Sequence, residues 1–201
     1  MGKLILIRHG ETSKNIDKEL HSVNDEEGLN ETGKKQIRLT AQRVAEYAPS
    51  IIYSSTEKRA LESAKIISDL LKIPMKPVEN MHERNWGVHI GKTWEDVKKI
   101  LDRMTLDERY FYTPQDGESW QTFEARLIDG IREIIAKHKN ETVIVISHRG
   151  AIRALIPFLL NRPKEESLKY SFDNGSLTIF DYDDKGFSKV LVNDTGHFVE
   201  I

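Results

Sequence analysis

Short apolar runs, each bounded by polar or turn-forming residues, recur along the chain. Three of them, at 4–7, 51–53 and 142–146, are continuous, which is typical of strands buried on both faces of a sheet. A fourth run, at 74–78, carries prolines at two positions, so we predict a short strand at a sheet edge. Two further runs, at 177–180 and 189–192, flank Asp183-Asp184-Lys185-Gly186 and predict a hairpin at the sheet edge.

Apolar residues spaced three and four positions apart predict helices between these strands. The expected helices cover about 30–48, 57–71, 94–104, 120–138 and 151–160. Pro49 should stop the first helix, and Pro157 should kink or end the last. We expect a loop or irregular helix at 13–27, an irregular segment at 81–87 and a loop with exposed aromatic residues at 106–117.

Strands that alternate with helices indicate an α/β fold, and specifically a three-layer α/β/α sandwich with a mostly parallel central sheet. The chain has 201 residues, and we find no internal repeat, linker or low-complexity segment. A chain of this length can bury one continuous core. We therefore expect a single domain that covers residues 1–201.

Composition excludes several classes of function. The formal net charge is −2, which gives no broad electrostatic attraction to nucleic acid or to anionic lipid. No apolar run approaches the roughly 20 residues that a membrane span needs. The absence of cysteine excludes disulfides and thiolate metal sites. A strand begins almost at the N-terminus and no signal peptide is visible, so we expect a cytoplasmic location.

The candidate chemistry lies where the three buried strands end. The first strand runs into Arg8-His9-Gly10, the second into Ser54-Ser55 with Arg59 soon after, and the third into Ser147-His148-Arg149-Gly150. Parallel strands place their carboxyl ends on one edge of a sheet, where ligands of open α/β sheets bind. Two histidines and two arginines would then meet in one pocket.

A cationic pocket of this kind suits a phosphoryl group, whose transfer depends mostly on positioning and charge stabilisation. The sequence has no glycine-rich phosphate loop with its lysine, and no aspartate cluster arranged for magnesium. A histidine nucleophile with arginine clamps needs no metal.

The motifs, taken together, resemble those of the histidine phosphatase superfamily, the branch that contains the cofactor-dependent phosphoglycerate mutases and many small phosphatases. The resemblance covers nearly the whole chain and implies a phosphoglycerate mutase-like fold. The matching stretches, in order, are Arg8-His9-Gly10-Glu11-Thr12 with Asn15, Leu29 to Gln36, Ser54 to Ala64 around Arg59, Glu83 before Gly87, Gly117-Glu118-Ser119 with Arg126, and Ser147-His148-Arg149-Gly150.

The resemblance also implies roles for individual residues. His9 would be the nucleophile that becomes phosphorylated. Arg8, Arg59 and His148 would surround the phosphoryl oxygens, and Asn15 would add a hydrogen bond. Glu83 would protonate the leaving group and later take a proton from the attacking water. Arg149 replaces the glycine or alanine of many relatives, and it would touch the substrate through its side chain or lend only a backbone N–H.

Two enzyme activities fit these motifs, and a third interpretation needs no activity. The first is a metal-independent phosphatase that acts on a small phosphorylated metabolite through a phosphohistidine. The second is a phosphoglycerate mutase with 2,3-bisphosphoglycerate as cofactor. Mutases of the family usually carry paired arginines after the acid motif, whereas this chain offers Arg84, Lys92, Arg103 and Arg109 with no adjacent pair. The third is a catalytically silent binding module.

The phosphatase interpretation is the one we carry forward. Its partner would be a small-molecule phosphate ester, with no nucleic acid, no membrane and no cofactor or metal, and a homodimer is compatible with it. The stretch 21–28 lacks the aromatic-glycine pair that many relatives have there, so substrate contacts carried by that pair do not transfer to this chain. The other histidines, at 21, 82, 89, 138 and 197, are expected to be structural or on the surface.

Overall fold

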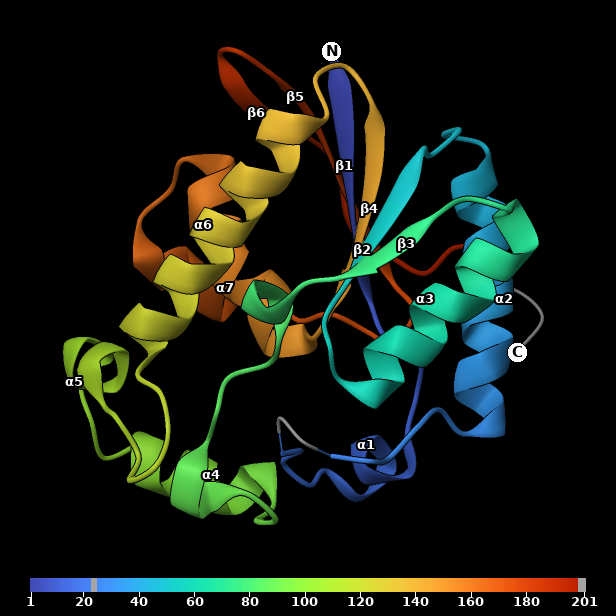
Figure 1. Cartoon of the computed structure of the whole chain (residues 1–201). Coiled ribbons are helices and arrows are strands. Elements are labelled where there is room, and N and C mark those ends of the chain that lie inside the picture. Colours follow the sequence, from blue (N-terminus) through green and yellow to red (C-terminus); the bar gives the residue numbers. More distant parts are fainter. Residues whose placement is uncertain (23–24, 199–201) are drawn as a thin grey trace.

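A central β-sheet with helices on both faces forms the body of the protein (Figure 1). The computed structural model describes residues 1–22 and 25–198. The sheet has six strands in the order β3-β2-β4-β1-β5-β6. They are β1 (Gly2–Arg8), β2 (Ile51–Ser54), β3 (Met75–Pro77), β4 (Thr142–Ser147), β5 (Leu177–Asp183) and β6 (Gly186–Asp194).

The sheet is mostly parallel, as the sequence predicts. β1, β2 and β3 each pair in parallel with a neighbour in the row β3-β2-β4-β1, while β5 pairs antiparallel with β1 and with β6. The predicted edge strand is confirmed as β3, and the predicted hairpin is confirmed as β5 and β6, with both strands longer than expected.

Alternating side chains of the buried strands build two cores, one on each face of the sheet. Leu4 and Leu6 of β1 point to the side covered by α6 (Trp120–Lys137) and α7 (Arg149–Leu160). Ile5 and Ile7 point to the side covered by α2 (Glu31–Ala45) and α3 (Lys58–Leu71). Both faces are thereby buried, which is why these strands are continuously apolar.

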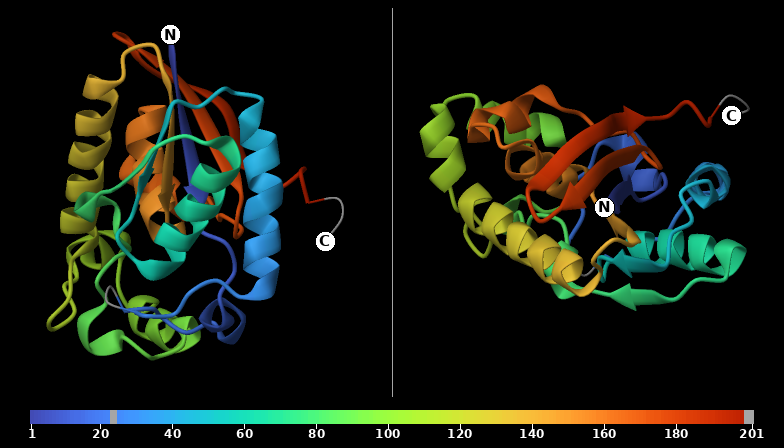
Figure 2. Two further views of the ribbon diagram at one scale, coloured as in Figure 1. Left: turned by 45° about the vertical axis from the view of Figure 1, so that its right-hand side comes forward. Right: turned by 90° about the horizontal axis from the view of Figure 1, so that it is seen from above.

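The short helices gather at the end of the sheet where the parallel strands finish. They are α1 (Ser13–Asp17), α4 (Trp94–Leu101) and α5 (Leu106–Phe111), together with the 3₁₀ turns η1 (Glu79–Met81) and η2 (Gly87–His89) and, after α7, η3 (Lys164–Lys169). The views in Figures 1 and 2 place α1 and α4 across this edge, below the strand ends. A small separate core of Trp86, Val97 and Leu101 holds α4 in place.

Several predicted boundaries are wrong. The segment 106–117 is not a loop throughout, because Thr105 and Glu108 form a capping box that starts α5. α2 ends at Ala45 rather than near 48, where Ala48 adopts a positive φ of 46°. α4 ends at Leu101 rather than near 104.

The last helix also differs from its prediction. α7 starts at Arg149, two residues earlier than expected, with His148 as its N-cap. Pro157 lies inside α7 and does not end it. The buried neighbours Ile156 and Leu159 hold the turns on either side of the proline against the sheet, so packing offsets the lost backbone hydrogen bond. Within the described residues, no helix is both long and apolar enough to cross a membrane.

Candidate active site

The three predicted strand ends meet at one edge of the sheet. β4 lies between β1 and β2, and the register pairs Arg8 with Ser147 and Ser54 with Ile146. The His9 backbone N–H continues this pairing by donating to the Ser147 carbonyl at 3.0 Å. The expectation that parallel pairing gathers these residues is confirmed.

A cavity of about 500 Å³ opens at this edge. Six of the seven predicted site residues line it: Arg8, His9, Asn15, Arg59, Glu83 and Arg149. The seventh, His148, is buried beside the cavity, with its ring centroid 5.2 Å from that of His9. Basic side chains outnumber acidic ones in the lining, so the cavity favours an anion.

A backbone contact fixes which nitrogen of the His9 ring carries the proton. Its Nδ1 lies 2.7 Å from the Gly10 carbonyl oxygen. A carbonyl can only accept, so Nδ1 carries the proton and Nε2 keeps its lone pair. Burial, aided by Arg59 and His148, lowers the pKa of His9 well below its usual value, which keeps the ring neutral. Gly10, which the sequence did not identify, is therefore the group that orients the ring.

Two arginines near His9, Arg8 and Arg59, carry N–H groups that are available to a ligand. Arg8 donates through Nη1 to the Phe172 carbonyl at 2.8 Å, and burial lowers its pKa to about 10, so it stays charged at neutral pH. Arg59 forms a buried ion pair with Glu57 through Nη2. Arg8 Nε and Arg59 Nε and Nη1 are buried without a hydrogen-bond partner among the described residues. Buried N–H groups of this kind are rare unless a ligand completes them.

The Glu83 carboxyl group is held by the backbone on both sides. Its Oε1 accepts from the Arg84 N–H at 2.8 Å, and its Oε2 accepts from the Gly150 N–H at 2.9 Å in the first turn of α7. Burial raises the pKa of Glu83, and the nearby Glu57 raises it further. A Cβ atom at position 150 would lie 2.4 Å from Oε1, so only glycine allows this approach.

Asn15 and Arg149 take different positions. The Asn15 side chain completes the capping box of α1 and accepts from Asn174 Nδ2 at 2.9 Å. Arg149 is exposed at the cavity wall, where its Nη2 donates to Ser171 Oγ at 2.8 Å. The Arg149 side chain therefore lies within reach of a ligand, whereas the adjacent Gly150 supplies the backbone N–H that holds Glu83.

Sequence reasoning missed several residues of the site. Asn174 lines the cavity and donates to the His9 carbonyl at 3.0 Å, and Glu57 is almost fully buried against Arg59 and His148. Asn174 lies in an irregular segment before β5 that carries no periodic signal. Glu57 looked like an ordinary acidic residue at a helix start. Trp86, Trp94 and Trp120 also line the cavity.

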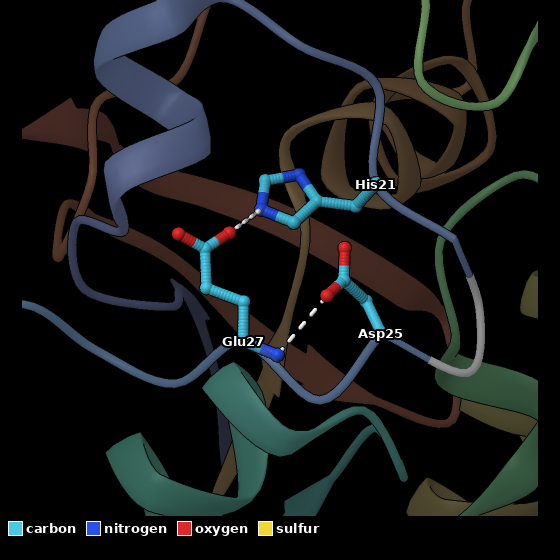
Figure 3. Close-up of side chains that lie close together, drawn as sticks. All are labelled: His21, Asp25 and Glu27. Atoms are coloured by element: carbon cyan, nitrogen blue, oxygen red, sulfur yellow. Dashed lines mark hydrogen bonds and ion pairs between the residues drawn. The ribbon is translucent and has the colours of Figure 1, made fainter.

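His21 lines the cavity, and its contacts with Thr12 and Glu27 fit its interpretation as a structural histidine. Its ring lies 6.2 Å from the His9 ring, and burial lowers its pKa to about 3. Glu27 contacts His21 Nε2 at 3.4 Å (Figure 3). Its carboxylate also accepts from the Lys14 N–H, which ties this segment to α1. Within the stretch 21–28, which lacks the aromatic-glycine pair of many relatives, Val23 and Asn24 lie outside the described residues.

His21, Asp25 and Glu27 are close enough together to resemble a metal site (Figure 3). The Asp25 carboxylate, however, already pairs with the Lys14 ammonium group. A bound cation would have to displace that lysine, so the cluster is accounted for by its own ion pairs.

Comparisons with known proteins all point to one family. A sequence model of the histidine phosphatase superfamily (branch 1) matches residues 4–195. A metal-independent phosphoserine phosphatase of Arabidopsis thaliana is 33% identical over 159 residues, covering 76% of this chain and 66% of that protein. Phosphoserine phosphatase 1 of Hydrogenobacter thermophilus is 29% identical over 203 residues, covering 100% of this chain and 96% of that protein.

A solved structure agrees with these sequences. A mutant phosphoserine phosphatase from Entamoeba histolytica, in complex with phosphoserine, superposes with a TM-score of 0.85 at 27% identity, over 99% of this chain and 100% of that one. The family motifs, the fold and the cavity at the strand ends coincide in one molecule. The chain therefore belongs to the histidine phosphatase superfamily (branch 1) and is a phosphatase of that superfamily.

Proposed function

We propose that this protein hydrolyses the phosphate monoester of a small metabolite without a metal, through a phosphohistidine at His9. The observation that carries the proposal is the neutral His9 ring, which Gly10 orients through Nδ1. Arginine N–H groups without a hydrogen-bond partner among the described residues flank this ring. A neutral nitrogen next to fixed positive charge is what attack on a phosphoryl group requires.

In the first step, His9 Nε2 attacks phosphorus and the bond to the leaving oxygen breaks. Arg8 and Arg59 balance the charge on the phosphoryl oxygens, and the protonated Glu83 gives its proton to the leaving oxygen. In the second step, the Glu83 carboxylate takes a proton from water, the water oxygen attacks phosphorus, and the P–N bond breaks. Inorganic phosphate leaves and His9 returns to its neutral form. The raised pKa of Glu83 supports the acid role.

The geometry favours hydrolysis over mutase activity, in which the phosphoryl group returns to a different oxygen of the substrate. Of the four basic residues that follow the acid motif, Arg84 lines this cavity, while Lys92, Arg103 and Arg109 are absent from its described lining. Arg84 is itself committed, because it donates to the carbonyls of Glu118 and Tyr112 and stacks over Trp86. The residues that follow the acid motif therefore do not supply the adjacent pair of arginines that a mutase usually carries there.

The substrate class follows from the cavity and from the relatives. Arg149 and Arg153 lie on the wall beside the catalytic groups, so a leaving group with its own negative charge would find a partner there. Two sequence relatives are named phosphoserine phosphatases, and a third protein of that name is solved in complex with phosphoserine. We therefore propose a small phosphorylated metabolite that carries a second anionic group, and phosphoserine and 3-phosphoglycerate are the first two compounds to test.

Replacement of His9 tests the proposal directly. His9→Ala should abolish turnover of p-nitrophenyl phosphate and of the physiological ester, because the nucleophile is gone. Wild-type protein quenched without acid after mixing with labelled substrate should carry acid-labile label on His9. Turnover that survives in His9→Ala, or label on another residue, would contradict the covalent mechanism.

A panel of phosphorylated metabolites then separates the remaining activities. Release of inorganic phosphate identifies the phosphatase, and formation of a phosphate isomer identifies the mutase. A chain with neither product, and with no hydrolysis of p-nitrophenyl phosphate, would be the silent binding module.

A further inference from the structure

Glu57 is a buried carboxylate that the reaction above does not use. It occupies the N-cap position of α3, yet its side chain makes no capping hydrogen bond there. Only 2% of Glu57 is exposed. Burying a charged side chain is unfavourable unless it is paired, so its partners indicate what it does.

The three partners of Glu57 all belong to the catalytic set. Its Oε2 contacts Arg59 Nη2 and lies 3.0 Å from His148 Nε2. Its Oε1 accepts from the Glu83 N–H at 3.0 Å. One side chain thus contacts the phosphate clamp, the second histidine and the backbone of the acid.

The contact with His148 decides which of its nitrogens donates. Nε2 faces the Glu57 carboxylate and lies 2.8 Å from Ser55 Oγ. Burial raises the pKa of Glu57, and the Arg59 guanidinium opposes that shift by pairing with the carboxylate. The carboxylate of this ion pair only accepts, so Nε2 carries the proton. In a neutral ring Nδ1 then has a lone pair, and Nδ1 is buried without a hydrogen-bond partner among the described residues. A lone pair next to a phosphoryl oxygen would be repulsive.

Protonation of the ring removes this conflict. An imidazolium donates from both nitrogens, so Nε2 would still donate to Glu57 while Nδ1 donated to a phosphoryl oxygen. Burial and Arg59 lower the pKa of His148 well below its usual value, so the ring is neutral before an anion binds. A bound dianion, together with the Glu57 carboxylate on the opposite side, favours the charged ring.

We propose that Glu57 is a positioning residue that prepares His148 to take up one proton from solvent when a phosphoryl group binds, with Nε2 fixed on Glu57 and Nδ1 donating to the phosphoryl oxygen. The proposal rests on the function given above, because it assigns the phosphoryl group to the same cavity. It adds a proton to the binding step and assigns the counter-charge to Glu57, a residue to which the resemblance gave no role.

The other titratable groups near the ring do not supply this counter-charge. Arg8 of β1, Arg59 of α3, His21 after α1 and His82 after η1 all act to lower the His148 pKa. Glu83 accepts two backbone N–H groups, and its pKa is raised by burial. Glu57 is the carboxylate that touches His148 in the described chain.

Sulfate is a suitable probe, because it mimics a tetrahedral dianion and does not titrate near neutral pH. Calorimetric titration of wild-type protein with sulfate, in two buffers of different ionisation enthalpy, should show about one proton taken up per sulfate. The sulfate affinity should then fall about tenfold per pH unit above the pKa of free His148. Glu57→Gln should lose this uptake and flatten the pH dependence, and Glu57→Asp should partly restore both.

Two matched variants isolate the effect. Glu79→Gln removes the same charge from an exposed side chain near Glu83, and it should leave the proton uptake unchanged. Glu83→Gln should also keep the uptake, which separates protonation of His148 from protonation of the acid. Uptake that persists undiminished in Glu57→Gln, or that disappears in Glu83→Gln, would overturn the proposal.

The wild-type protein provides a test that does not depend on any variant folding. Nitrogen NMR of the labelled His148 ring should show the change from neutral to charged when sulfate is added near pH 7. A ring that stays neutral in the complex would overturn the proposal, even if Glu57→Gln proved unstable.

These outcomes are distinct from failure of the phosphatase itself. Hydrolysis of p-nitrophenyl phosphate without proton uptake would refute the role of Glu57 and leave the phosphatase standing. Proton uptake with sulfate but no hydrolysis would refute the phosphatase and leave the role of Glu57 standing.

Discussion

At the scale of the residue, the carboxyl group of Glu83 should make the reaction rate depend on how basic the leaving group is. Breaking the P–O bond of an alkyl ester leaves a strongly basic alkoxide, whereas nitrophenolate leaves readily without a proton. General acid catalysis typically contributes about 10²–10⁴-fold. Glu83→Gln should therefore slow phosphoenzyme formation from an alkyl phosphate by about that factor, and formation from p-nitrophenyl phosphate by much less.

The measurement must be a single-turnover burst, because in the proposed mechanism Glu83 also activates water in the second step. Steady-state rates would fall for both substrates and hide the difference. An equal loss of burst rate on the two substrates would assign the leaving-group proton to a different residue.

In the proposed mechanism, the protonation states of His9 and Glu83 together set the pH dependence. His9 must be neutral, and its lowered pKa keeps it neutral even below the usual histidine value of about 6.5. Glu83 must be protonated for the first step, and its raised pKa keeps the proton above the usual glutamate value of about 4.3.

Burst rates on an alkyl phosphate should consequently fall as pH rises through the Glu83 pKa, and should show no acid limb from His9 near pH 6.5. Glu83→Gln should remove the alkaline limb, while Glu79→Gln should keep it. An alkaline limb that is unchanged in Glu83→Gln would assign it to another group.

At the scale of the element, the N-terminus of α7 positions the acid. Gly150 lies in the first turn, donates its N–H to Glu83 Oε2, and leaves room for the carboxyl because it has no Cβ. Alanine suits a helix better than glycine, by about 1 kcal/mol. Gly150→Ala should therefore fold, yet displace Glu83 and lower the burst rate on alkyl phosphates by up to about 10²–10⁴-fold.

A second helix glycine gives the control. Gly130 lies in α6, and a Cβ there would meet the Cε atom of Met81, the flexible end of a long side chain. Gly130→Ala should keep its activity, with thermal unfolding measured for both variants. Full alkyl phosphatase activity in Gly150→Ala would show that the Glu83 position tolerates displacement.

For the whole molecule, the proposed mechanism takes the charge that balances the phosphoryl group from arginines that the fold brings together. Arg8 belongs to β1, Arg59 to α3 and Arg149 to α7. We expect turnover to be unchanged after treatment with EDTA, and to be inhibited by vanadate, which mimics five-coordinate phosphorus. Loss of activity in EDTA that magnesium restores would contradict the arginine clamp, and mock-treated enzyme is the control.

Local pattern was sufficient for much of this protein. The continuous apolar runs determined β1, β2 and β4, because strands buried on both faces need apolar side chains at every position. The polar ending of each run identified Arg8, His9 and His148, and parallel pairing then placed them together. Pro74 and Pro77 limited β3 to the edge, where a missing N–H costs least.

Tertiary structure alone decided the rest, because those features depend on contacts between segments far apart in the chain. No local pattern indicates that Glu57 turns away from its own helix toward His148, 91 residues later, or that Asn174 reaches the His9 carbonyl. The pKa shifts of His9 and Glu83 come from burial, which exists only once the cavity walls assemble. Sequence determined which chemical groups stand at the strand ends, and folding determined their protonation and their partners.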